Sequence, residues 1–121
     1  MVTVPAFLLR KLYVKQSLRN VEGGFEFKLK NGLGSGYAYR MQPLSVDGKE
    51  MPVAASTFAL DGKAIRFSDV SKENTFTLAM NKTVTIRVDG VSLPPGPHKV
   101  GMGFDVPGLG TLKFDFTDVV A

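Results

Sequence analysis

Apolar and polar residues alternate along several short stretches of this 121-residue chain. In Phe25–Lys30, phenylalanine and leucine occupy every second position, and charged residues fill the positions between them. Thr83–Val88 has the same period of two, with β-branched residues at most positions. Because successive side chains of an extended chain point to opposite faces, both stretches predict strands with one buried face.

Shorter stretches with the same alternation predict further strands, separated by tight turns. Asp47-Gly48 and Asp61-Gly62 each stand between two such runs, and Asp-Gly favours the hairpin turn whose two central residues have positive φ angles. The strands at residues 8–18 and 25–30 are expected to pair as a hairpin through a turn at residues 19–24. The full set of expected strands is 8–18, 25–30, 44–46, 49–53, 57–60, 63–67, 76–78, 83–88, 99–106 and 111–117.

Helical periodicity is weak throughout the chain. No stretch places apolar residues at helical spacing over three turns, and residues 68–73 are the one place where a short helical turn is expected. Residues 1–7 are predicted to be a flexible lead-in. The pattern therefore predicts an all-β chain: one antiparallel β-sandwich domain over residues 1–121, immunoglobulin-like in architecture, with at most one short helical turn.

The segment Leu93-Pro94-Pro95-Gly96-Pro97-His98 predicts a rigid corner between two strands. Each proline fixes φ and lacks an N–H group, so a strand must end here, and Gly96 supplies the freedom that the corner needs. His98 is the only histidine in the chain. A structural role is expected for it, as for the rest of the corner, because catalysis would need a nearby nucleophile and an orienting carboxylate.

Composition and charge narrow the range of functions. The chain has no cysteine and one histidine, which excludes disulfides and metal sites built from several histidines. The formal net charge of +4 is interpreted as a solvated sheet face, because the aromatic residues alternate onto the opposite face from the lysines. No long apolar run indicates a signal peptide or membrane span. We therefore expect a cytoplasmic protein with neither nucleic acid nor membrane as a partner.

Tyr37, Tyr39 and Arg40 are the candidate residues for binding or partner contact. The two tyrosines stand two positions apart after a glycine-rich loop, so an extended chain would place them on the same side. They could stack on a sugar or pack in a core or an interface.

Asp105, Asp115 and Asp118 lie near the end of the chain. No spacing among them indicates catalysis, and they are interpreted as outward-facing strand charges, with a glycosidase-like carboxylate pair left open. No residue is assigned as catalytic, and none as a metal ligand.

Four stretches, in this order, resemble the small (β) subunits of bacterial C-glycoside deglycosidases: Arg10–Lys15, Gly24–Asn31, Val46–Gly48 and Leu93–His98. The resemblance implies a non-catalytic accessory subunit with a β-sandwich fold and no cofactor of its own. It also implies a larger partner subunit, a sugar isomerase/epimerase-like barrel that holds a divalent metal. Such complexes cleave the carbon–carbon bond between an oxidised sugar and an aromatic aglycone.

Two alternatives to the accessory subunit stay open. One is a free-standing or homo-oligomeric β-sandwich module that binds carbohydrate or has a structural role. The other is an independent hydrolase that uses Asp105, Asp115 or His98. The substrate and the stoichiometry of any complex are not determined by the sequence.

Overall fold

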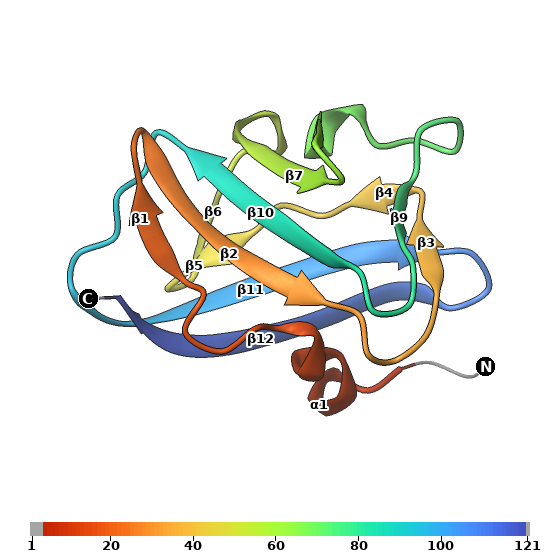
Figure 1. The fold of residues 1–121 in the computed structure, drawn as a ribbon, viewed down its shortest axis with the longest axis horizontal. Helices are drawn as coiled ribbons and strands as arrows, with labels where there is room; N and C mark the ends of the chain where they lie inside the picture. The colour runs from red at the N-terminus through yellow and green to blue at the C-terminus, as the bar shows by residue number, and fades with distance from the viewer. Residues whose placement is uncertain (1–3, 121) are drawn as a thin grey trace.

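The structure is a computed structural model that describes residues 4–120, and it consists of two antiparallel sheets packed face to face (Figure 1). One sheet has the strand order β1 (Arg19–Val21), β2 (Gly24–Lys30), β10 (Thr83–Asp89), β7 (Ser56–Leu60) and β8 (Lys63–Arg66). The other has the order β12 (Gly110–Val120), β11 (Gly96–Val106), β5 (Ser45–Val46) and β6 (Lys49–Glu50), and β4 (Arg40–Met41) also pairs with β11. A separate pair, β3 (Gly36–Ala38) and β9 (Phe76–Leu78), closes one end. The predicted all-β sandwich is confirmed.

The core fills the space between the two sheets, as the alternation requires. Buried residues alternate with more exposed ones along most of β2, β10 and β12. β11 alternates in the same way as far as Met102, after which Gly103, Phe104 and Asp105 are all buried. Aromatic rings join the two layers: Phe27 of β2 contacts Phe116 of β12 edge-on at 5.1 Å, and Tyr13 stacks on Phe116 at 3.6 Å. Burial of these rings therefore ties both sheets into one core.

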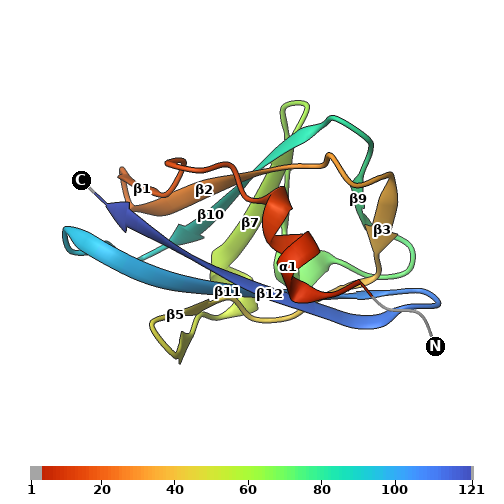
Figure 2. The same cartoon turned by 90° about the horizontal axis from the view of Figure 1, so that it is seen from below.

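The first expected strand is wrong. Residues 8–18 begin instead in α1 (Ala6–Leu9), followed by a turn of 3-10 helix, η1 (Arg10–Leu12). Leu9 and Leu12 are both buried, and their spacing of three residues is helical. The helical segment is too short for this spacing to be recognised in the sequence. The turn lies against β12 beside the seam between the sheets (Figure 2). Of the predicted lead-in, residues 1–3 lie outside the described residues, whereas α1 already includes residues 6 and 7.

The predicted hairpin partner of β2 is wrong for the same reason. Only Tyr13 of the first segment forms a bridge to β2, opposite Leu29. The hairpin is formed by β1, which was expected to be part of the turn, and its actual turn is Glu22-Gly23. The register brings Gly24 beside the backbone of β10, where a Cβ atom would overlap the carbonyl of Val88. This glycine is required by close approach of two strands rather than by its φ angle.

Helical turns are short. Besides α1 and η1, the described chain has two turns of 3-10 helix, η2 (Val53–Ala55) and η3 (Phe67–Asp69). The turn η3 lies at the start of the segment predicted to contain a helical turn, and η2 begins after Pro52, which ends the strand expected over residues 49–53. The Asp-Gly hairpins form as predicted: Asp47 and Asp61 have φ angles of 51° and 52°.

The proline corner connects β10 of one sheet to β11 of the other. Gly96 has a φ angle of 120°, a conformation that residues with a side chain rarely adopt. β11 then pairs with β12 over eleven residues, the longest ladder in the molecule. The corner therefore sets where the two sheets join at the end of the sandwich opposite β3 and β9 (Figure 1).

Candidate functional site

The end of the sandwich formed by β3 and β9 contains an apolar hollow of about 270 Å³. Buried side chains of β9, β11 and β12 form its floor, among them Leu78, Phe104 and Leu112. Leu33 and Tyr37 stand at its rim with exposed fractions of 43% and 49%. No charged side chain lines the hollow within the described part of the chain. It is therefore suited to an apolar occupant.

Asn31 fixes the glycine-rich loop that forms part of this rim. Its amide nitrogen donates to the carbonyls of Gly34 at 2.5 Å and Leu78 at 2.9 Å, and its amide oxygen accepts the N–H groups of Leu33 and Gly34. The side chain is 4% exposed, with its polar atoms bonded to the protein. The sequence indicates only a glycine-rich loop here, a mobile loop or a strand break, and it gives no sign of this role of Asn31, because the carbonyl of Leu78 comes from a distant strand.

The structure separates the three candidate contact residues. Tyr37 lines the hollow, whereas Tyr39 lies next to β4 with the Lys72 ammonium group 5.8 Å from its ring centre. The Arg40 guanidinium lies 3.7 Å from the carboxylate of Asp105. The two tyrosines and the arginine thus have different neighbours, and they do not form one aromatic platform.

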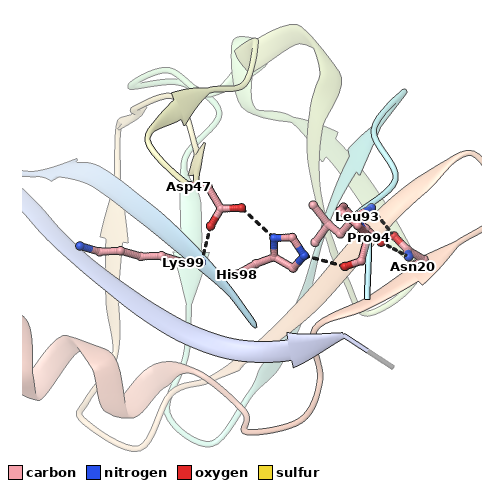
Figure 3. A network of polar contacts seen from close by, with 6 residues as sticks. All are labelled: Asn20, Asp47, Leu93, Pro94, His98 and Lys99. Carbon is pink, nitrogen blue, oxygen red and sulfur yellow. Dashed lines mark hydrogen bonds and ion pairs between the residues drawn. The ribbon is translucent and has the colours of Figure 1, made fainter. Parts of the chain in front are cut away.

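His98 is held in a polar clamp at the opposite end of the sandwich (Figure 3). Its Nδ1 atom lies 2.7 Å from Oδ2 of Asp47, and its Nε2 atom lies 2.6 Å from the carbonyl oxygen of Pro94. The bond to Asp47, and then the bond to Pro94, raises the pKa of His98 above its ordinary value. The backbone N–H of Lys99 and the His98 ring lower the pKa of Asp47. The expected structural role of the histidine agrees with these contacts.

The rest of the corner is fixed by Asn20 of β1. Its side chain accepts the N–H of Leu93 and donates to the Leu93 carbonyl, both at 2.8 Å (Figure 3). Leu93 itself is buried. Asn20 was assigned only to a turn in the sequence, where nothing indicates that it meets a residue 73 positions away.

The three carboxylates near the end of the chain have separate structural partners. Asp105 accepts hydrogen bonds from Thr111 and Gln42, and Asp115 pairs with Arg10. Asp105 and Asp115 are four residues apart along the ladder, or about 13 Å, since Asp115 lies opposite Gly101. Catalytic carboxylate pairs of glycosidases are closer, at roughly 5–9.5 Å.

Asp118 bonds to the N-terminal segment rather than to another carboxylate. The hydroxyl of Tyr13 donates to its Oδ2 atom at 2.7 Å, and the backbone N–H of Gln16 donates to the same oxygen. The bond from Tyr13 lowers the pKa of Asp118, and burial together with this bond raises the pKa of Tyr13 to about 12. The structure therefore does not assemble the carboxylate pair that the sequence left open.

Among residues 4–120, no group of three or more His, Cys, Asp or Glu side chains is placed to hold a metal ion. Within the same residues, no helix is long and apolar enough to cross a membrane.

Comparison with known proteins places the chain in a family. The family model described as hydroxymethylglutaryl-CoA reductase, N-terminal domain, matches residues 8–121, almost the whole chain. The chain belongs to this family. No curated protein sequence matches it.

Membership of this N-terminal domain family corrects the function predicted from the sequence. The resemblance to C-glycoside deglycosidase small subunits is wrong, and so are the accessory role in that complex and the sugar isomerase/epimerase-like barrel partner. The assignment to carbohydrate metabolism is wrong as well, and the alternative of a carbohydrate-binding module is not supported. The residues that suggested the resemblance are mainly turn and strand residues: a Gly-Phe strand, an Asp-Gly turn and a proline corner. Backbone geometry explains them, and unrelated β domains need the same residues in such places.

Proposed function

We propose that this domain is a non-catalytic docking domain of a hydroxymethylglutaryl-CoA reductase, and that the hollow beside β3 receives an apolar segment of the reductase's catalytic part. The family whose model matches the chain supports the choice of enzyme. The exposed apolar rim of the hollow supports the choice of contact surface.

The rim of the hollow is the main evidence for a contact surface, because exposed apolar side chains lie there. Leu33 and Tyr37 line the hollow. Met80, which is 49% exposed, lies beside it, because its backbone N–H donates to the hydroxyl of Ser35, a residue of the lining. Single exposed apolar residues are common on protein surfaces, but a group of them around an apolar hollow is typical of a contact surface.

The size of the hollow favours a protein segment over a large substrate. Pockets that enclose drug-sized ligands measure about 300–1,000 Å³, and this hollow measures about 270 Å³. Hydroxymethylglutaryl-CoA, with its many charged groups, would find no charged side chain along this lining.

Tyr39 and Arg40 do not line the hollow, and their part in the contact stays a prediction. A cytoplasmic location belongs to the same proposal.

Sedimentation velocity tests the docking with the purified chain, alone and mixed with the reductase of the source organism prepared without this domain. We expect a complex that Leu33→Ser and Tyr37→Ser each weaken at least tenfold. Val119→Ser is the matched control, because Val119 is 61% exposed but does not line the hollow. It should leave the affinity unchanged.

Three results would contradict the proposal. No complex with the reductase would remove the docking role. A complex that the rim variants leave intact would place the contact elsewhere. Self-association of the chain alone, lost in the rim variants, would make a second copy the occupant.

A further inference from the structure

Both ring nitrogens of His98 face hydrogen-bond acceptors. Nδ1 lies 2.7 Å from a carboxylate oxygen of Asp47, and Nε2 lies 2.6 Å from the carbonyl oxygen of Pro94. A neutral imidazole has one N–H group, so one of these short contacts would then join two acceptors. Only the doubly protonated imidazolium donates to both.

The proton cannot come from the other partners. The carbonyl of Pro94 has none to give, and the second carboxylate oxygen of Asp47 accepts the backbone N–H of Lys99 at 2.9 Å. That bond and the one to His98 lower the pKa of Asp47, which keeps the carboxylate ionised at neutral pH.

The charged groups around the ring also favour the imidazolium. Asp47 faces it from the turn between β5 and β6. Asp118 lies directly opposite it in β12, on the same inner face. Lys99, the next residue of β11, points to the outer face and lies 3.9 Å from Asp115. The His98 ring is 8% exposed and the Asp47 side chain 52% exposed, so the ring meets this carboxylate at the edge of the solvent. The carboxylate of Asp118 is bonded to Tyr13 and Gln16 instead.

The corner depends on few polar bonds. Pro94 and Pro95 have no N–H group, so their backbone nitrogens cannot anchor the corner. The carbonyl of Pro94 is bonded to His98, and the backbone of Leu93 is bonded to Asn20. We propose that His98 is an imidazolium in the folded domain at neutral pH, and that losing this proton at alkaline pH releases Pro94 and loosens the corner between β10 and β11.

The pH range follows from the directions of the two shifts. The folded-state pKa of His98 is raised, so the stability that it contributes is complete below the unfolded value of 6.5 and is lost as pH rises through the higher folded value. The folded-state pKa of Asp47 is lowered, so its contribution is complete above the unfolded value of 3.8 and is lost as pH falls through the lower folded value. The stability that the two groups contribute is therefore complete between these two unfolded values, and the part contributed by His98 declines above 6.5 until its folded-state pKa is passed.

NMR spectroscopy of the full chain tests the proposal directly, because His98 is the only histidine and its ring signals are unambiguous. We expect ¹H–¹⁵N correlations to show both ring nitrogens protonated at pH 7, with a titration midpoint above 6.5. The ¹³C shift of the Pro94 carbonyl should change with the same midpoint. One protonated ring nitrogen at pH 7, or a midpoint at or below 6.5, would overturn the assignment of the imidazolium.

A matched pair of variants tests the cause. Asp47→Asn should lower the midpoint, since it removes the carboxylate but keeps a residue that tolerates positive φ. Asp61 occupies the same kind of Asp-Gly turn as Asp47, with a φ angle of 52° against 51°, but it does not contact His98. Asp61→Asn should therefore leave the titration midpoint of His98 unchanged. Equal midpoints in both variants would overturn the role of Asp47. A Pro94 carbonyl shift that stays constant while His98 titrates would overturn the release of the corner.

Discussion

Tyr13 shows how a single residue connects parts of the chain that are far apart in sequence. Its ring stacks on Phe116, and its hydroxyl donates to Asp118 and accepts the N–H of Leu18. The ring is buried. In the described chain, two groups of the N-terminal segment donate to the carboxylate of Asp118: the hydroxyl of Tyr13 and the backbone N–H of Gln16. Packing and polar bonding therefore act together on this side chain.

Tyr13→Phe keeps the ring and removes the hydroxyl. We expect a loss of about 1–3 kcal/mol in the free energy of unfolding, because the N–H of Leu18 is left unpaired in a buried place. The loss should shrink at acid pH, since the bond from Tyr13 lowers the pKa of Asp118 and its benefit disappears as pH falls through that lowered value.

Urea unfolding at pH 7 and at pH 3 measures both effects. Tyr37→Phe is the control, because Tyr37 is half-exposed and its hydroxyl takes part in none of the hydrogen bonds described here. A loss for Tyr13→Phe no larger than for this control would contradict the prediction.

Pairs of strands bring backbones together in ways that single strands do not reveal. β2 is flanked by β1 and β10, and its first residue, Gly24, lies opposite Asp89 of β10. A Cβ atom at Gly24 would overlap the carbonyl of Val88, whereas a Cβ atom at Gly36 of β3 would meet nothing within 4 Å. The two glycines occur in strands, and only the first is required by its neighbours.

Gly24→Ala should lower the free energy of unfolding by about 1–3 kcal/mol, because β2 and β10 must move apart to admit the methyl group. Gly36→Ala, with a φ angle outside the left-handed region, should leave stability unchanged or slightly higher. Thermal unfolding of the two variants gives the comparison. Equal midpoints would show that the β2–β10 register differs from the one described.

The whole molecule is held together by one core shared between the sheets. Phe27 and Phe116 come from opposite layers and contact each other, and Phe58, Phe76 and Phe104 continue the contacts toward the hollow. Since neither layer has a core of its own, both should unfold in one transition.

Phe116→Ala should cost about 3–5 kcal/mol by leaving a cavity between the layers. Far-ultraviolet and near-ultraviolet circular dichroism, followed through a urea titration, should give coincident transitions for the wild type and the variant. Phe7→Ala is the control with small effect, because Phe7 is 64% exposed. Two separate transitions in the wild type would contradict the shared core.

The sequence by itself determined the fold class, most of the main strands and the Asp-Gly turns. Alternation in β2 and β10, the Asp-Gly turns and the proline corner are local, because each depends on the conformational preferences of a few neighbouring residues. The same local character explains the wrong family: strand and turn residues are shared by unrelated β domains, whereas the family model matches residues 8–121 as a whole.

Tertiary structure decided which residues meet. Leu9 and Leu12 form helical turns because β12 and the core offer a buried surface to that spacing, which two leucines in sequence do not indicate. Asn31 reaches Leu78, Asn20 reaches Leu93 and Asp47 reaches His98 across 47 to 73 residues. These contacts form only when the sheets pack, so the rim of the hollow and the clamp around His98 exist in the folded domain alone.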